Sequence, residues 1–149
     1  MNGHQLKSIV DKDKYISRML GGILKASDLG KICYRKGPPK AYIVNVGDHW
    51  TLLVFYKNKT VYFDSYGDKP KKSLLAVTGC VQQSILKLQP TNSSLCGLYV
   101  IFVLYYLARG VSFHKVLHMF YKKTLSNDKL VANFVLNHYG FDVQSEIKV

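Results

Sequence analysis

Four side chains of this sequence have the types that acyl-transfer chemistry needs. Cys96 is a candidate nucleophile, and His49 can take up and return a proton. Asp64 can hold the imidazole ring in one orientation, and the Gln89 amide can donate to a developing oxyanion. A thiol nucleophile requires such a base, an orienting group and an oxyanion donor together. Each residue alone has an ordinary structural explanation, so the prediction depends on the combination.

The sequence around Cys96 favours a reactive thiolate. Apolar residues continue from Leu98 to Ala108, and Gly110 follows them, which predicts a buried helix with Cys96 in its first turn. The expected cap residues are Asn92, Ser93 and Ser94. The unpaired N–H groups and the positive end of the helix dipole lower the pKa of a thiol at this position. Gly97 is expected to leave room for a substrate carbonyl.

Two predicted strands bring His49 and Asp64 together. Residues 50–57 and 60–66 are rich in β-branched and aromatic residues, and the short polar link Asn58-Lys59 joins them. As a hairpin, these strands place His49 and Asp64 at the same open end. The imidazole and the carboxylate are therefore expected within reach of each other.

The remaining patterns predict an α+β fold in which a small, antiparallel-dominated sheet packs against helices and a central buried helix carries the cysteine. Residues 4–20 have helical spacing, and Gly21-Gly22 is expected to cap that helix. Residues 41–46 and 84–89 predict further strands, and the second of these ends at Gln89. Two more helices are predicted over residues 111–123 and 128–140, with Gly140 as the stop. The prolines of residues 35–40 predict a loop.

Composition limits the class of protein. A chain of 149 residues with 48% hydrophobic residues is expected to form a single domain over 1–149. Its apolar runs are too short to cross a bilayer and its N-terminus lacks a secretory pattern, so we expect a soluble, non-secreted monomer without a membrane partner. Cys33, Cys80 and Cys96 show no CxxC spacing, which argues against a disulfide framework or a cysteine-rich zinc site.

Charge indicates a polyanionic partner. The chain has 21 Lys and Arg residues against 9 Asp and Glu, a formal net charge of +12. The basic residues are dispersed, which predicts contacts to the DNA backbone without sequence recognition. A basic surface that serves only solubility is the alternative.

Metal binding has little support in the sequence. His114 and His118 stand four residues apart, a spacing that zinc ligands use on a helix. No carboxylate or cysteine nearby completes a tetrahedral set. We therefore expect no metal and no small-molecule cofactor.

The site residues lie in motifs that resemble the adenovirus-type cysteine proteases, the adenains. The matching residues are His49-Trp50, Asp64 in "YFDSYG", and Gln89 followed after seven residues by the cysteine of "NSSLCGLY". The resemblance is close around His49-Trp50 and around residues 92–99. Weaker similarity in "QLKSIV", "AYIVNV" and "NDKLVANFVLNHYGF" extends the resemblance over nearly the whole chain. The order His, acid, Gln, Cys is shared with the SUMO-deconjugating proteases, which also have Asp where the adenovirus enzymes have Glu.

This resemblance implies an adenain-like fold and a thiol endopeptidase. Cys96 would be the nucleophile, His49 the general base and acid, and Asp64 the orienting carboxylate, with Gln89 in the oxyanion hole. The family cleaves viral capsid and core precursors after small residues, commonly glycine. The implied source is a DNA virus or a virus-like element, and the implied location is the virion and the host nucleus.

The resemblance also implies a role for Cys80. Adenovirus proteases are activated by DNA and by a short peptide that forms a disulfide with a cysteine upstream of the oxyanion glutamine. Cys80 lies nine residues before Gln89, and the segment after it could form an edge strand that accepts a peptide strand. A structural thiol without this role is the alternative.

Three other functions stay open at the level of sequence. The same four residues could serve a deconjugase that removes ubiquitin-like proteins, or an acyltransferase that moves an acetyl group. The charge alone would also suit a non-catalytic DNA-binding module.

Overall fold

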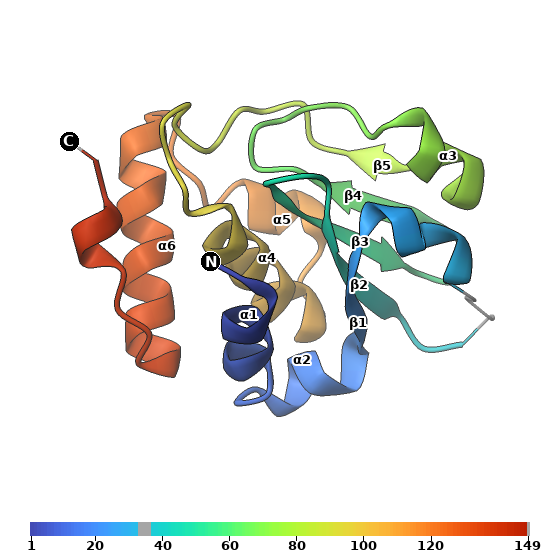
Figure 1. The fold of residues 1–149 in the computed structure, drawn as a ribbon, viewed down its shortest axis with the longest axis horizontal. Coiled ribbons are helices and arrows are strands. Elements are labelled where there is room, and N and C mark those ends of the chain that lie inside the picture. The colour runs from blue at the N-terminus through green and yellow to red at the C-terminus, as the bar shows by residue number, and fades with distance from the viewer. Residues whose placement is uncertain (33–36, 149) are drawn as a thin grey trace.

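A computed structural model describes residues 1–32 and 37–148, and its strands form a five-stranded sheet in the order β1-β2-β3-β4-β5 (Figure 1). The strands are β1 (Leu20–Lys25), β2 (Lys40–Asn45), β3 (Trp50–Phe55), β4 (Thr60–Phe63) and β5 (Gln82–Gln83). The central strands β2, β3 and β4 are antiparallel, whereas β1 and β5 run parallel to their neighbours. The α+β class is confirmed, and the sheet is mixed. Cys33 and the start of the predicted loop 35–40 lie outside the described residues.

Helices cover this sheet. They are α1 (Gly3–Val10), α2 (Lys14–Met19), α3 (Lys72–Thr78), α4 (Cys96–Ala108), α5 (Phe113–Leu117) and α6 (Thr124–Tyr139), with 3₁₀ helices at Ala26–Lys31 and Gln144–Glu146. Helix α4 contacts β3 on one side and α6 on the other, so it lies between the sheet and α6 (Figure 1). Within the described residues, none of the helices is long and apolar enough to cross a membrane.

The central strands are buried on both faces. Along β3, Leu52 and Val54 belong to the large apolar cluster around α4, while Leu53 belongs to a smaller cluster with Leu74 of α3 and Leu29 of the first 3₁₀ helix. Successive side chains of a strand point to opposite faces of the sheet. The two clusters therefore explain why the strand sequences are almost continuously apolar.

The N-terminal segment forms two helices and a strand, so the prediction of one helix over residues 4–20 is wrong. Asp13 separates the helices because its Oδ1 accepts the backbone N–H groups of Tyr15 and Ile16, at 3.0 and 3.1 Å, and so begins α2. Gly21-Gly22 lies in β1 and caps no helix. A Cβ at Gly21 would lie 2.6 Å from ring carbons of Tyr42, so a larger residue here would have to displace that ring.

Residues 84–89 form no strand, contrary to the prediction, because β5 ends before them. The backbone N–H groups of Leu88 and Gln89 both donate to the carbonyl of Ser65, at 2.8 and 3.0 Å. The Leu88 carbonyl accepts from Nδ2 of Asn127, at 2.9 Å. The backbone groups of Leu88 and Gln89 thus form hydrogen bonds with a loop and with α6, and not with a neighbouring strand.

The C-terminal helices differ from the prediction in their lengths. Helix α5 covers only part of the predicted residues 111–123, and α6 begins before the predicted residue 128. The Asn127 side chain holds the turn between them, since it accepts from Tyr121 N at 2.7 Å and donates to Tyr121 O at 2.8 Å. Gly140 is confirmed as the helix stop, with a left-handed φ of 71°.

Candidate active site

His49 and Asp64 meet at the open end of the β3–β4 hairpin. His49 directly precedes β3 and Asp64 directly follows β4, and the pairing of Leu52 with Phe63 sets the register between these strands. Nε2 of His49 lies 2.8 Å from Oδ1 of Asp64. The same carboxylate oxygen accepts the backbone N–H of Tyr66, at 2.8 Å. The carboxylate is buried and fixed, so it determines the orientation of the imidazole.

Cys96 is the first residue of α4 and a buried free cysteine. The backbone N–H of Trp50 donates to its sulfur at 3.4 Å, which places the thiol beside the residue that follows His49. Because Nε2 of His49 is engaged by Asp64, Nδ1 is the ring nitrogen left for the thiol. Nucleophile, base and orienting acid therefore form one group.

The electrostatics of this group favour an ion pair. Burial lowers the pKa of His49, but hydrogen bonds and charges from Asp64 and Cys96 outweigh it and raise that pKa to about 9. Burial raises the pKa of Cys96, yet the hydrogen bond with His49 and the N–H groups of Trp50 and Gly97 bring it below the ordinary value of a thiol. Both shifts favour a thiolate on Cys96 beside an imidazolium on His49.

Gln89 is fully buried in the loop before α4. Its Oε1 accepts from the Ser65 hydroxyl at 2.5 Å, which fixes the rotation of the amide. Its Nε2 donates to the carbonyl oxygen and to Oγ of Ser93, at 3.0 and 3.1 Å. Donation to an oxyanion would require one of these N–H groups to turn away from Ser93.

The start of α4 differs from the expected arrangement. The N-cap residue is Leu95, which makes no side-chain cap, although Oγ of Ser93 accepts the Leu95 N–H at 3.2 Å. A Cβ at Gly97 would lie 2.9 Å from the sulfur of Met1 and 3.4 Å from Leu6. The Cβ side of Gly97 therefore faces Met1 and Leu6, so this glycine is explained by close packing against the N-terminal residues.

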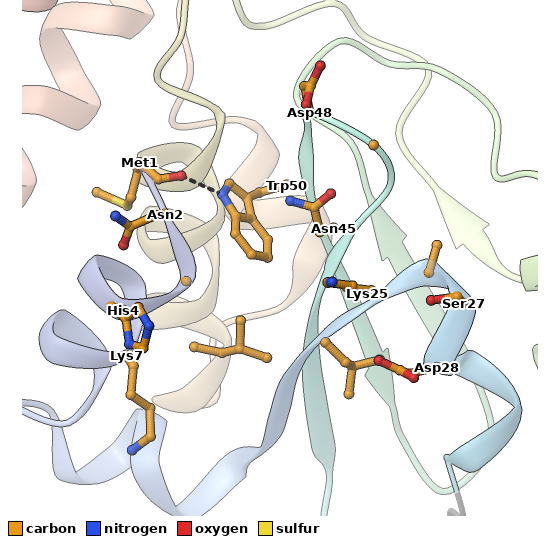
Figure 2. Close-up of a pocket in the computed structure, with 15 residues that line it drawn as sticks. Met1, Asn2, His4, Lys7, Lys25, Ser27, Asp28, Asn45, Asp48 and Trp50 are labelled. Atoms are coloured by element: carbon orange, nitrogen blue, oxygen red, sulfur yellow. Dashed lines mark hydrogen bonds between the residues drawn. The ribbon is translucent and has the colours of Figure 1, made fainter.

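A cleft of about 1120 Å³ lies beside the candidate site, between α1 and the β1 side of the sheet (Figure 2). The indole of Trp50 lies in its wall, and Nε1 donates to the carbonyl of Met1 at 2.9 Å. Gly47 and Asp48, which lead into His49, also line the cleft. Trp50 thus contacts the thiol through its backbone and the cleft through its ring.

Cys80 lies apart from the other four predicted residues. It is an exposed free thiol that precedes β5, the last strand in the order of the sheet. It lines a hollow with residues 55–60, the closed end of the hairpin, whereas His49 and Asp64 lie at the open end.

Metal ligands do not gather in the part of the chain that the structure describes. No group of three or more His, Cys, Asp or Glu side chains there is placed to hold an ion. His114 and His118 lie with ring centroids 4.3 Å apart.

Other residues around the site were not predicted from the sequence. The ring of Tyr66 lies 4.8 Å from that of His49, centroid to centroid, and Ser65 holds Gln89. Their position directly after the predicted acid could have indicated both. Asp128 bonds to Ser93 from α6, and no spacing in the sequence indicated it.

Comparisons with known proteins leave the family of the chain open. A scan against models of known protein families finds none that matches, and a search of curated proteins finds none that is similar.

Proposed function

We propose that this chain is a cysteine endopeptidase of the adenain type. The observation that carries the proposal is the imidazole of His49, bonded to a buried carboxylate and paired with a lowered-pKa thiol at the start of a helix. The order of these residues along the chain, with Gln89 before α4, also agrees with the adenain arrangement. An adenain-like form of the α+β fold is part of the proposal.

Acylation begins with attack of the Cys96 thiolate on the carbonyl carbon of a peptide bond. The carbonyl electrons move to oxygen, and we assign the resulting oxyanion to the Cys96 N–H and the Gln89 amide. The tetrahedral species collapses with cleavage of the C–N bond. The imidazolium of His49 gives its proton to the leaving amine, which departs neutral.

Hydrolysis of the thioester completes the cycle. The now neutral His49 takes a proton from water, and the oxygen of that water attacks the acyl carbon. Collapse expels the Cys96 thiolate and releases the carboxylic acid, so the thiolate–imidazolium pair is restored. Asp64 keeps the imidazole in place through both halves of the reaction.

The cleft beside Trp50 is the proposed seat of the peptide that precedes the cleaved bond. Its wall includes the apolar side chains of Ile23, Leu24 and Trp50. We propose substrates cut after small residues such as glycine, as the resemblance to the adenains implies. Viral capsid or core precursors, processed in the virion or the host nucleus, are the proposed substrates.

We further propose that the dispersed positive charge binds DNA and that Cys80 tethers an activating peptide. The Cys80 thiol is exposed and lies next to β5, an outer strand of the sheet, which supports the tether. The test compares kcat/KM of wild type and Cys80→Ser with and without cysteine-containing capsid peptides. Activation that disappears in Cys80→Ser supports the tether, whereas an enzyme that the peptides do not activate contradicts it.

A substrate panel tests the proposed function. Peptide-coumarin, ubiquitin-like and acetyl-CoA substrates are given to wild type and Cys96→Ala, with and without DNA. We expect Cys96-dependent release of coumarin after glycine. Preferential turnover of ubiquitin-like substrates would indicate a deconjugase, and preferential turnover of acetyl-CoA would indicate an acyltransferase. DNA binding without turnover of any substrate would indicate a non-catalytic binding module.

A further inference from the structure

The loop that carries Gln89 is anchored from two sides. On the sheet side, Ser65 accepts the backbone N–H groups of Leu88 and Gln89 and donates its hydroxyl to Gln89 Oε1. On the helix side, consecutive residues of α6 bond to the two flanks of Gln89. Asn127 donates to the carbonyl of Leu88 at 2.9 Å, and Asp128 accepts the hydroxyl of Ser93 at 3.0 Å.

The hydrogen-bond directions link Asp128 to the amide of Gln89. An ionised carboxylate can only accept hydrogen bonds, so the Ser93 hydroxyl must donate its proton to the hydrogen bond with Asp128. The lone pairs of Ser93 Oγ are then free to accept, and they receive Nε2 of Gln89 and the N–H of Leu95. Tyr99 donates its hydroxyl to the same oxygen of Asp128, at 2.8 Å. Because the carboxylate accepts from Ser93, the Ser93 oxygen is left to accept from Gln89. The carboxylate thereby determines which group donates in each bond from Gln89 through Ser93 to α6.

Burial makes these bonds effective as positioning contacts. Asp128 is 2% exposed, and Asn127 and Gln89 are fully buried, so water competes little for their partners. A buried carboxylate is costly where an apolar side chain could fill the same volume. Here the hydroxyl groups of Ser93 and Tyr99 both donate to one oxygen of the carboxylate.

We infer that Asp128 is a positioning residue that acts through the hydroxyl of Ser93, which keeps one N–H of the Gln89 amide in place when the other turns to the oxyanion. The inference rests on the proposed function, because Gln89 acts as an oxyanion donor only in an acyl-transfer reaction. It assigns a part of the site to α6, which supplies none of the four residues predicted from the sequence.

Four variants separate positioning from general stability. Asp128→Leu removes the bond between Ser93 and Asp128, and Ser93→Ala removes that bond together with the Oγ that accepts from Gln89. Asp128→Asn keeps an acceptor oxygen, and Tyr99→Phe removes the other donor to the carboxylate while leaving the Ser93 bond. Ser93 is only half-buried, so Ser93→Ala is expected to fold even if Asp128→Leu does not.

The kinetic result expected is a fall in kcat without a matching change in KM. Loss of a whole oxyanion donor costs about 10²–10³ in kcat, so a loosened donor in Ser93→Ala should cost about tenfold. Asp128→Asn and Tyr99→Phe should stay within about twofold of wild type. Alkylation of Cys96 by iodoacetamide forms no oxyanion, so its rate should be unchanged in all folded variants. A kcat of Ser93→Ala equal to that of wild type overturns the inference.

A second measurement does not require peptidase activity. The side-chain amide protons of Gln89, assigned in NMR spectra by their loss in Gln89→Met, should exchange slowly with solvent in wild type and in Tyr99→Phe. Exchange should be faster in Ser93→Ala. Unchanged exchange overturns the positioning role. If wild type hydrolyses no peptide while Ser93→Ala still accelerates exchange, the positioning contact stands and the proposed function fails.

Discussion

At the scale of single residues, the charge on Cys96 depends on partners that are already in place. The imidazole of His49 is held by Asp64, and the thiol receives the backbone N–H of Trp50 without any movement of the chain. These three side chains are therefore already in position, whereas the Gln89 amide is bonded to Ser93. For the proposed reaction, preorganised groups of this kind give the most effective electrostatic stabilisation.

Removal of the reacting groups should separate their roles. We expect Cys96→Ala and His49→Ala to lower kcat by on the order of 10⁶-fold with the fold intact. Asp64→Asn should be less severe, on the order of 10⁴-fold, because it disturbs only the orientation of the imidazole. Fluorogenic peptide assays measure the rates, and circular dichroism checks folding. Full activity in Cys96→Ala would rule out the assigned nucleophile.

The pH dependence should follow the ion pair. Activity requires both the thiolate and the imidazolium, so kcat/KM should rise as pH passes the lowered pKa of Cys96 and fall as pH passes the His49 pKa of about 9. In His49→Ala, iodoacetamide alkylation of Cys96 should need a higher pH, because the thiolate has lost its cation. An alkylation profile that His49→Ala leaves unshifted would contradict the pairing.

At the scale of elements, the sequence predicted what depends on local pattern. The β3–β4 hairpin follows from strand-forming residues around a short link, and α4 follows from its apolar run between polar residues and Gly110. Strand β1 was not predicted, because it pairs in parallel with β2, which is distant in the sequence. Its two glycines are also typical of the end of a helix. The link from Asp128 to Ser93 was missed because only the packing of α6 against α4 creates it.

The glycine in β1 should be sensitive to a single added methyl group. Gly21→Ala would push a Cβ against the buried ring of Tyr42, and overpacking of this kind costs about 1–3 kcal/mol in the free energy of unfolding. Gly30→Ala is the matched control, because a Cβ added there would meet no atom within 4 Å. It should change stability by less than about 0.5 kcal/mol. Urea unfolding of both variants measures the difference, and equal stabilities would contradict the close contact.

The buried carboxylate on α6 should cost stability. Burial raises the pKa of Asp128 above its ordinary value, although Tyr99 and Ser93 donate to it. The folded state then holds the proton more tightly than the unfolded state, so this group favours folding less as pH rises through the raised pKa. We expect Asp128→Asn to raise Tm at pH 7, by an amount that shrinks as pH falls and the wild-type carboxyl is protonated. A Tm difference independent of pH would show that ionisation of Asp128 is not the cause.

At the scale of the whole molecule, the net charge of +12 should govern association with DNA. When binding releases counterions, the logarithm of the association constant falls linearly with the logarithm of the salt concentration. The slope is about −0.9 for each phosphate contact. We expect a steep slope and equal affinities for unrelated duplexes, measured by fluorescence anisotropy. A flat salt plot would contradict binding through the phosphate backbone.

Trp50 is the one tryptophan of the chain, and it adjoins both the thiol and the cleft. Light that excites tryptophan but not tyrosine therefore reports on a single place in the molecule. Emission from the indole should change when a peptide enters the cleft, and change again when Cys96 becomes acylated. In Cys96→Ala only the first change can occur. The intrinsic fluorescence of Trp50 should therefore distinguish substrate binding from acylation without an added label.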